Sequence, residues 1–262
     1  MNCRLNKKKV LNQFNKAAYS YDSVAGMQRM IVDELCRLMP TSFSADSKLI
    51  DLGCGTGYAL QQLTGLFPDL SLHGVDIAPK MLEVANEAAS QVSYFAADIE
   101  HLPFNDHSFD IVFSSSAIQW CDLHRVGSEI KRIIRPDGQI YISSFLEGTL
   151  DNWRALWMDD NAQRQQHFAN YQQVVDTFNN LGFTDIEIEQ KTLEQTFTSF
   201  ESAVSSIKQL GAGNATRSRE TGLMSKTNYF SIKAAINTII QEQGQLILPY
   251  KVVYITATAG QN

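Results

Sequence analysis

The sequence predicts an α/β fold in which a mostly parallel sheet carries helices on both faces. Apolar runs of strand length alternate with segments of helical periodicity from residue 49 to residue 145. The first run, LIDL at 49–52, leads directly into three glycines at alternate positions. The next two predicted strands end in aspartates, Asp76 and Asp98. Ligands of open α/β sheets bind outside the carboxyl ends of the strands, so we expect a binding site at this edge.

Length and composition limit the function classes. The chain has 262 residues, 44% of them hydrophobic and 19% charged, which suits one large globular domain with an insertion. A net charge of −6 argues against general nucleic-acid binding. Four cysteines without CxxC pairing indicate reduced thiols rather than disulfides or a zinc site. No apolar run approaches the roughly 18 residues of a membrane span, so we expect no membrane contact and a cytoplasmic location.

The loop after the first strand is predicted to bind a ligand. Gly53, Gly55 and Gly57 let the backbone turn sharply and approach a ligand closely before a helix begins near Tyr58. Their GxGxG spacing differs from the GxGxxG pattern that binds a pyrophosphate. The adjacent Asp51 would repel a pyrophosphate but attract a cation. A nucleoside that carries positive charge, such as S-adenosylmethionine, fits these features. The alternative is an ordinary tight connection between strand and helix.

Residues 1–46 are predicted to be helical. One apolar stripe contains Val10, Phe14 and Ala17, and a second ends at Pro40 and contains Met27, Met30, Ile31, Leu35 and Leu38. The segment AAYSYDSVA at 17–25 separates the two stripes. It is either a lid over the ligand site or a polar turn.

The central part continues the alternation. Helices are predicted at about 58–66, 79–89 and 123–134, and strands at 70–76, 92–98, 108–115 and 139–145, with the turn RPDG at 135–138 before the last strand. Asp76 is placed to bind ribose hydroxyls, to cap the helix that starts at Pro79, or both. The fourth strand leads to Ser114, Ser115, Gln119 and Trp120, which are candidates for the rim of the site unless Trp120 lies in the core.

The second half is less regular. Residues 147–167 are predicted to be helical, and an amphipathic helix within 167–183 ends at Gly182. Strands follow at 184–193 and 246–258, and between them 199–242 are helical with a polar interruption, GAGNATRSRETG. Helices in this position usually carry substrate specificity.

Several motifs together resemble one family. They are FNKAAYSYDSVAGMQR at 14–29, LIDLGCGTGY at 49–58, VDIAPKML at 75–82, ADIEHLPFNDHSFDIVFSSSAIQWC at 97–121, GTL at 148–150, SIKQLGAGNAT at 206–216 and GQLILPYKVVYITA at 244–257. This combination resembles the BioC family, the malonyl-acyl carrier protein O-methyltransferases of biotin synthesis. The resemblance implies a Rossmann-like class I methyltransferase with a seven-stranded, mostly parallel sheet. It implies one integrated domain with an N-terminal helical lid at 1–46, an S-adenosylmethionine-binding core at 47–146, and the rest of the sheet with helical substrate-binding insertions at 147–262.

The resemblance also implies site residues. Cofactor contacts are expected from Asp51, Gly53, Cys54, Gly55, Gly57, Asp76, Ile77, Met81, Asp98, Ile99, Ser114 and Ser115. Asp98 would meet the adenine amino group, unless it lies in a surface turn, and Ile99 would pack on the ring. Tyr21 is the candidate lid residue, with a packing role as its alternative, and Gln119 and Trp120 would shape the acyl pocket. Where the family carries an Asn-Arg-Phe run, this chain has Gln166, His167 and Phe168, so His167 or the nearby Arg164 would bind the malonyl carboxylate. The family's closing Thr-Tyr is Pro249-Tyr250 here.

The implied reaction methylates a carboxylate and produces S-adenosylhomocysteine. A carboxylate with a pKa of about 4.3 is already ionised at neutral pH, so neither a general base nor a metal is required. The expected partner is malonyl-acyl carrier protein, or malonyl-CoA in its place. An acidic carrier would need a basic patch, for which the candidates are Lys7, Lys8, Lys9, Arg29, Lys208, Arg217 and Arg219. The alternatives are a class I methyltransferase for another small acid or a quinone-type acceptor, and a binding protein that holds the nucleoside without chemistry.

Overall fold

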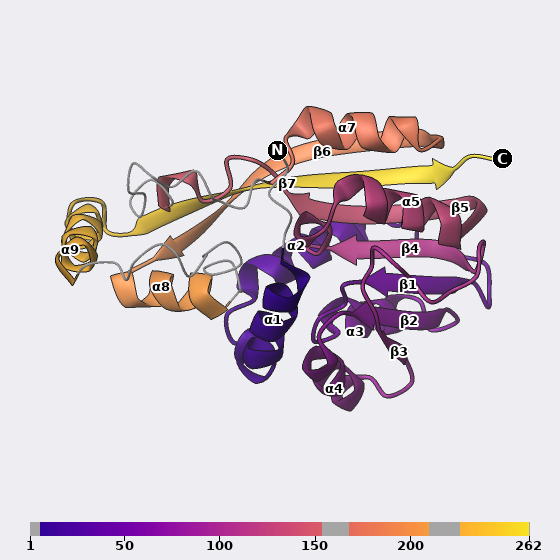
Figure 1. Cartoon of the computed structure of the whole chain (residues 1–262), viewed down its shortest axis with the longest axis horizontal. Coiled ribbons are helices and arrows are strands. Elements are labelled where there is room, and N and C mark those ends of the chain that lie inside the picture. Colours follow the sequence, from indigo (N-terminus) through magenta and orange to yellow (C-terminus); the bar gives the residue numbers. More distant parts are fainter. Residues whose placement is uncertain (1–5, 154–167, 210–225, 262) are drawn as a thin grey trace.

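The computed structural model describes residues 6–153, 168–209 and 226–261. Within them, strands form one seven-stranded sheet in the order β3-β2-β1-β4-β5-β7-β6 (Figure 1). The strands are β1 Lys48–Leu52, β2 Ser71–Asp76, β3 Ser93–Ala96, β4 Phe109–Ser115, β5 Ile134–Phe145, β6 Phe183–Phe197 and β7 Leu246–Ala259. The first five are parallel, and β7 inserts antiparallel between β5 and β6. This confirms the predicted seven-stranded, mostly parallel sheet.

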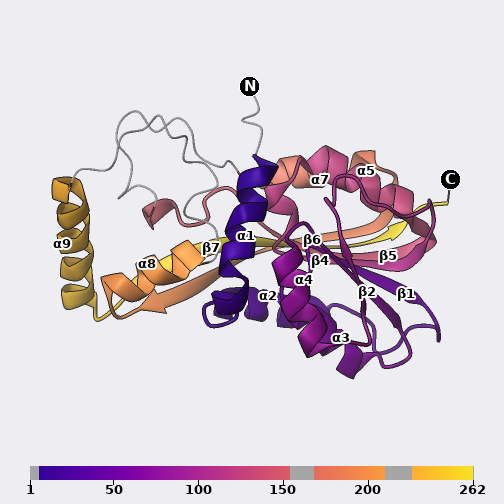
Figure 2. The same cartoon turned by 60° about the horizontal axis from the view of Figure 1, so that its bottom comes forward.

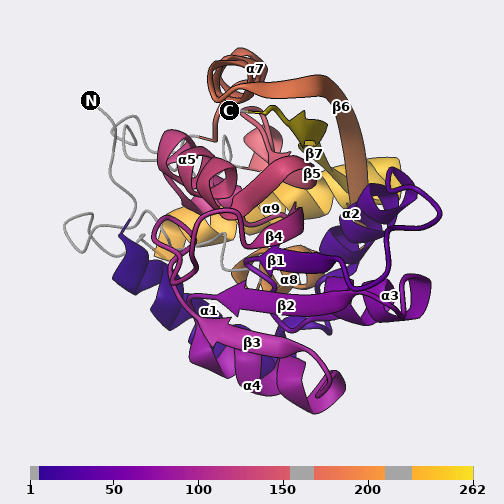
Figure 3. The ribbon, with the colours of Figure 1, turned by 90° about the vertical axis from the view of Figure 1, so that its right-hand side faces the viewer.

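Helices cover both faces of the sheet, as predicted. They are α1 Lys7–Tyr21, α2 Gly26–Arg37, α3 Tyr58–Leu66, α4 Pro79–Ala88, α5 Leu123–Ile133, α7 Tyr171–Asn180, α8 Phe200–Gln209 and α9 Lys226–Gln243, with a short 3-10 helix at Ile118–Trp120. Seen along the strands, α5 and α7 lie on one side of the sheet, and α2 and α3 lie on the other (Figure 3). No helix of the described residues is long and apolar enough to span a membrane.

The two faces of the sheet bury separate hydrophobic clusters. Neighbouring residues of one strand enter different clusters because strand side chains alternate in direction. Leu49 packs with α2 and α3, whereas Ile50 packs with α5 and α7. Phe113 and Val112 of β4 divide in the same way. Burial on both faces explains why the central strands are continuous apolar runs.

Capping residues set the helix ends that position the site. Gly57, in the left-handed region at φ 82°, precedes α3. The Asp122 carboxylate accepts from the amides of His124 and Arg125 at the start of α5. Gly182 at φ 73° follows α7, where the sequence predicted the end of that helix.

Two details differ from the sequence predictions. The segment 135–138 does not precede β5 but bulges out of it: Phe109 pairs with Ile134, while Ile111 pairs with Gln139. An ion pair of 2.6 Å between Arg135 and Asp110 holds this bulge against β4. In α2, Met30 and Leu38 are exposed rather than buried, because only one side of that helix faces the core.

The β6–β7 pair is longer than the rest of the sheet. The pairing of β5 with β7 ends at Phe145 and Val252, whereas β6 continues to pair with β7 as far as Phe197 and Leu246. The resulting two-stranded ribbon carries α8 and α9 away from the parallel strands (Figure 1). Helix α1 packs against α4 and also contacts α8, so it lies between the sheet and this extension (Figure 2).

Candidate active site

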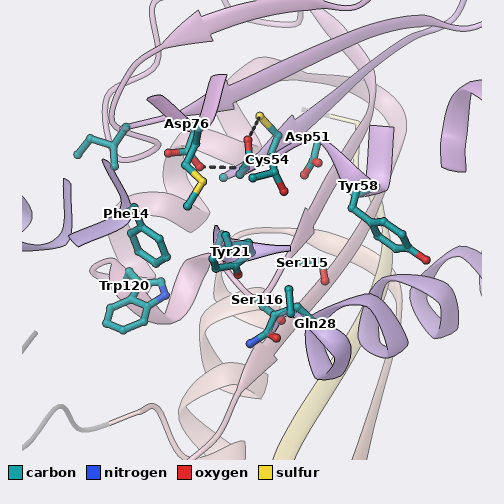
Figure 4. A pocket seen from close by; sticks show the side chains of 18 of the residues that line it. Phe14, Tyr21, Gln28, Asp51, Cys54, Tyr58, Asp76, Ser115, Ser116 and Trp120 are labelled. Atoms are coloured by element: carbon teal, nitrogen blue, oxygen red, sulfur yellow. Dashed lines mark hydrogen bonds between the residues drawn. The ribbon is translucent and has the colours of Figure 1, made fainter. Parts of the chain in front are cut away.

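A cavity lies at the carboxyl ends of the parallel strands, where the sequence predicted a site (Figure 4). Its walls come from the glycine loop after β1, the residues that follow β2, β3 and β4, and one side of α1 and α2. Most of the predicted cofactor residues line it: Asp51, Gly53, Cys54, Gly55, Asp76, Ile77, Met81, Asp98, Ile99 and Ser115. Tyr21 and Trp120 line it as well.

The glycine loop has a backbone that other residues adopt only with strain. Gly53, Gly55 and Gly57 all have positive φ, at 77°, 54° and 82°. A Cβ on Gly53 would also collide with the side chain of Ala117. The amides of Gly53 and Cys54 both donate to the Val75 carbonyl, which fixes the loop against β2. The turn is therefore built for close approach to a ligand.

Asp51 is an unpartnered acid at the floor of the cavity. Its side chain is only 2% exposed, and its Oδ1 has no hydrogen-bond partner among the described residues. Burial, with repulsion from Asp76, raises the pKa of Asp51 to about 8. An uncompensated buried carboxylate is costly, so the position is suited to a ligand that brings a cation.

Asp76 supports the glycine loop from the end of β2. Its Oδ2 accepts from the amide of Gly55 at 3.0 Å, and its Oδ1 accepts from the amide of Ala78 at 2.8 Å. The N-cap residue of α4 is Ala78, and no side chain caps this helix, so the capping role predicted for Asp76 is wrong: its carboxylate holds the loop before α4 instead. Burial outweighs these bonds and raises the pKa of Asp76 to about 6.

A second acidic group lies after β3. The ammonium of Lys7, at the first turn of α1, contacts Asp98 Oδ1 at 2.9 Å and Glu100 Oε1 at 2.8 Å. Asp98, Glu100 and His101 each bring one possible metal-ligand atom within 4.8 Å of the others. The cation that contacts this group in the structure is Lys7.

Aromatic side chains form the α1 side of the cavity. The Phe14 ring meets the Trp120 ring edge-on, with centroids 5.7 Å apart, and the Tyr21 ring at 6.3 Å (Figure 4). Trp120 therefore lines the cavity rather than the core. Burial, with the charges of Asp76 and Asp22, raises the pKa of Tyr21, so its phenol is neutral at physiological pH.

Residues of α2 complete the wall opposite the loop. Gln28 Oε1 and Arg29 Nε are both buried without a hydrogen-bond partner among the described residues. The Arg29 guanidinium lies over the Tyr58 ring, 5.1 Å from its centroid, and 3.6 Å from Asp22. Asp22 accepts a 2.7 Å hydrogen bond from Thr56 of the glycine loop. A guanidinium in a cavity wall whose Nε–H has no acceptor is suited to bind an anionic group.

Three predicted site residues do not line this cavity. Ser114 is fully buried, and its hydroxyl donates to the Leu52 carbonyl at the end of β1 at 2.7 Å. Gly57 lies at the start of α3, packed near Ala85. Gln119 is buried; its amide donates to the Ser116 carbonyl and accepts from the Ser144 hydroxyl, so it braces the loop after β4. These residues shape the site indirectly.

The predicted basic patch requires a correction. Lys7 and Arg29, proposed as carrier-docking residues, line the cavity and are paired with acids there. Arg217 and Arg219 lie outside the described residues, as does the side chain of Lys208. Arg164 and His167, the candidates for carboxylate binding, also lie outside them.

Sequence reasoning missed several residues of the cavity. Gln28 and Thr56 gave no signal of their own, although both belong to motifs that carried the family resemblance. Ser116 has a positive φ of 53° and a buried, unpartnered hydroxyl, and nothing in its sequence context distinguished it from Ser114. For Lys7, the sequence did contain a signal of tertiary contacts: a run of lysines at a helix N-terminus, where positive charge is unfavourable.

Comparisons with a protein-family model and with known relatives both identify methyltransferases. Residues 50–142 match a family model described as a methyltransferase domain. A malonyl-[acyl-carrier protein] O-methyltransferase of Dechloromonas aromatica is 32% identical over 255 residues, covering 97% of this chain and 95% of the relative. The biotin biosynthesis bifunctional protein BioHC of Teredinibacter turnerae is 30% identical over 95% of this chain, which corresponds to 46% of that protein.

Among solved structures, the fold is similar to phosphoethanolamine N-methyltransferase 2 of Haemonchus contortus in complex with phosphomonomethylethanolamine and S-adenosylhomocysteine. The TM-score is 0.60 at 23% identity, with 94% of this chain and 58% of that chain covered. At this identity the similarity supports the fold and not the substrate.

Proposed function

The chain belongs to the malonyl-[acyl-carrier protein] O-methyltransferase family, and we propose that it transfers a methyl group from S-adenosylmethionine to the free carboxylate of a malonyl thioester. The product is a methyl ester. Because the ester is neutral where the malonyl carboxylate was charged, the product resembles an ordinary acyl primer. A relative named for biotin biosynthesis supports a role in that pathway.

The observation that carries the proposal is the Asp51 carboxylate. It is buried and unpartnered in a cavity that also contains Asp76 and Asp98. The cofactor has matching groups: an ammonium and a sulfonium, two ribose hydroxyls and an adenine amino group. Asp51 would attract the positive end, Asp76 would accept from the ribose, and Asp98 would accept from the adenine amino group. The donor set therefore fits the cofactor.

Apolar and cationic side chains complete this fit. Ile77 and Ile99 line the cavity beside Asp98, where they would contact the two faces or the edge of the adenine ring. Arg29 and Gln28 would bind the carboxylate of the methionine part, because Arg29 Nε is buried without a partner in the described structure. Ser115 and Cys54 also line the cavity wall (Figure 4).

The transfer is an in-line displacement at the methyl carbon. The bond from methyl carbon to sulfur breaks with its electron pair left on sulfur, and a bond to the carboxylate oxygen forms, which gives S-adenosylhomocysteine and the ester. The acceptor is already ionised, so no residue has to remove a proton. The chain supplies alignment, which alone can contribute roughly 7–11 kcal/mol. Phe14, Tyr21 and Trp120 would exclude water from the reacting groups.

In this proposal, the part of the chain that follows the parallel strands binds the acceptor. Arg164 or His167 would bind the malonyl carboxylate, and Gln119 would support the pocket through its bonds to the loop after β4. The phosphopantetheine thioester would come from malonyl-acyl carrier protein, with malonyl-CoA as a smaller substitute. In this arrangement residues 1–46 act as the lid, 47–146 bind the cofactor, and 147–262 bind the acceptor.

The test combines binding and turnover. Calorimetry should detect binding of both S-adenosylmethionine and S-adenosylhomocysteine, and mass spectrometry should detect the addition of one methyl group to malonyl-acyl carrier protein. Acetyl-acyl carrier protein, which lacks the free carboxylate, is the matched control and should remain unmodified. Binding of neither nucleoside would reject the whole proposal. Binding without transfer to either malonyl thioester would retain the cofactor and reject the acceptor.

A further inference from the structure

Lys7 connects three segments that are far apart in the sequence. Its ammonium contacts Asp98 Oδ1 at 2.9 Å, Glu100 Oε1 at 2.8 Å and Cys121 Sγ at 3.2 Å. Asp98 and Glu100 follow β3, and Cys121 follows β4. One side chain of α1 therefore joins the lid to both loops that form this end of the cavity.

The position of Lys7 in its helix is locally unfavourable. The first turn of α1 contains Lys7, Lys8 and Lys9 and no acid, although the helix dipole favours negative charge there. Lys8 is exposed, whereas the side chain of Lys7 is only 26% exposed. A local conflict of this kind indicates that the residue is held by tertiary contacts. The contacts that hold Lys7 are the two carboxylates.

The bonds leave one oxygen of Asp98 available. Lys7 and the backbone amide of Glu100, at 3.1 Å, both donate to Asp98 Oδ1. No hydrogen bond within the described residues reaches Asp98 Oδ2. The Glu100 carboxylate is itself fixed, because its Oε1 accepts from the amide of Asp122 at 2.9 Å. The Asp98 carboxylate is thus anchored through one oxygen while the other remains for a ligand.

We propose that Lys7 is a positioning residue for adenine recognition, which holds the Asp98 carboxylate so that its Oδ2 accepts from the cofactor's amino group. This inference rests on the proposed function, since it assumes that the ligand at Asp98 is adenine. Lys7 does not compete with the cofactor, because the two donors use different oxygens. Loss of the ammonium would leave Glu100, whose side chain is 9% exposed, without its cation, and would leave the Asp98 carboxylate held by the Glu100 amide alone.

The experiment measures discrimination between two ligands on the same variant. S-adenosylhomocysteine carries the amino group, and S-inosylhomocysteine carries an oxygen in its place. Calorimetry on the wild-type chain should show a preference for S-adenosylhomocysteine of about tenfold or more, because the inosine oxygen faces an acceptor. Lys7→Met should reduce this ratio to about twofold or less, Lys7→Arg should retain most of it, and Lys8→Met should leave it unchanged.

The ratio separates positioning from general loosening of the lid. A loosened α1 would weaken both ligands equally and leave the ratio intact, which would overturn the inference. A wild-type chain that binds both ligands equally would also overturn it. A wild-type chain that binds neither would instead reject the proposed function. If thermal melting shows that Lys7→Met is unfolded, Lys7→Gln is compared with Lys8→Gln, and an unchanged ratio in Lys7→Gln contradicts the inference.

Discussion

Replacing Asp51 with asparagine removes the ability of this buried side chain to ionise while keeping its shape. The pKa of Asp51 is raised to about 8, so the cavity without ligand contains mostly the protonated acid at neutral pH. A ligand ammonium favours the carboxylate, and binding must therefore release a proton. The affinity for a cationic ligand should therefore rise with pH until Asp51 is already ionised in the free protein.

The magnitude follows from the same value. With a pKa of about 8, only about a tenth of the acid is ionised at pH 7, and ionisation then costs about 1.4 kcal/mol. With a charge-assisted bond of about 1.5–3 kcal/mol to the ionised form, affinity should increase roughly two- to sixfold between pH 6 and pH 7. A charge-assisted hydrogen bond contributes about 1.5–3 kcal/mol, so Asp51→Asn should bind only slightly more weakly at pH 6 and clearly more weakly at pH 7.5.

Calorimetry with S-adenosylhomocysteine at pH 6.0 to 7.5, in two buffers of different ionisation enthalpy, measures both the affinity and the number of protons released on binding. The wild-type chain should release roughly 0.5 to 0.9 of a proton at pH 7, and Asp51→Asn should release much less. Asp76, whose pKa is raised to about 6, contributes near pH 6 in both proteins and serves as an internal reference. Equal pH slopes for the two proteins would refute the role of Asp51. In the absence of ligand, the raised pKa makes the wild-type fold less stable as pH rises from about 4 to about 8, and the variant should lack this loss.

Three further changes test the site and the core. Gly53→Ala should reduce the affinity for S-adenosylhomocysteine at least about tenfold, because φ is 77° and the new Cβ collides with Ala117. Gly55→Ala, whose new Cβ has no atom nearby, is the control in the same calorimetry. Equal losses of affinity in the two variants would show that the collision is irrelevant. Arg29→Met should weaken binding by about 10- to 100-fold through loss of a charge-assisted bond, with Arg37→Met as exposed control; unchanged dissociation constants would exclude Arg29 as a ligand. Phe178 is fully buried on the core side of α7, so Phe178→Ala should lower the free energy of unfolding by about 3–5 kcal/mol in urea titrations without changing cofactor affinity. A loss below about 1 kcal/mol would contradict its place in the core.

The sequence was most informative where local rules determine the structure. The run from β1 through the glycine loop into α3 was predicted correctly because strand burial, positive φ and helix start are all properties of neighbouring residues. Asp76 and Asp98 could be placed at the site because parallel strands end at one edge. The amphipathic α7 and its stop at Gly182 follow from the same kind of pattern.

The errors arose where a contact depends on distant packing. Lys7 and Arg29 were interpreted as surface charges, since nothing near them in sequence shows that Asp98 or Tyr58 would lie beside them. Ser114 and Ser115 are neighbours on β4, and only the pairing of the strand decides which hydroxyl faces the cavity. The bulge at 135–138 has ordinary turn chemistry, and its place inside a strand depends on the partner β4.

The β6–β7 ribbon separates α8 and α9 from the strands that hold the glycine loop. Beyond Val252, its backbone pairs join only these two strands, so an insertion between Phe197 and Leu246 adds to the ribbon's end without altering the parallel strands or the glycine loop. Sequence changes within α8 and α9 therefore leave the pairing of the parallel strands intact, and with it the support of the glycine loop.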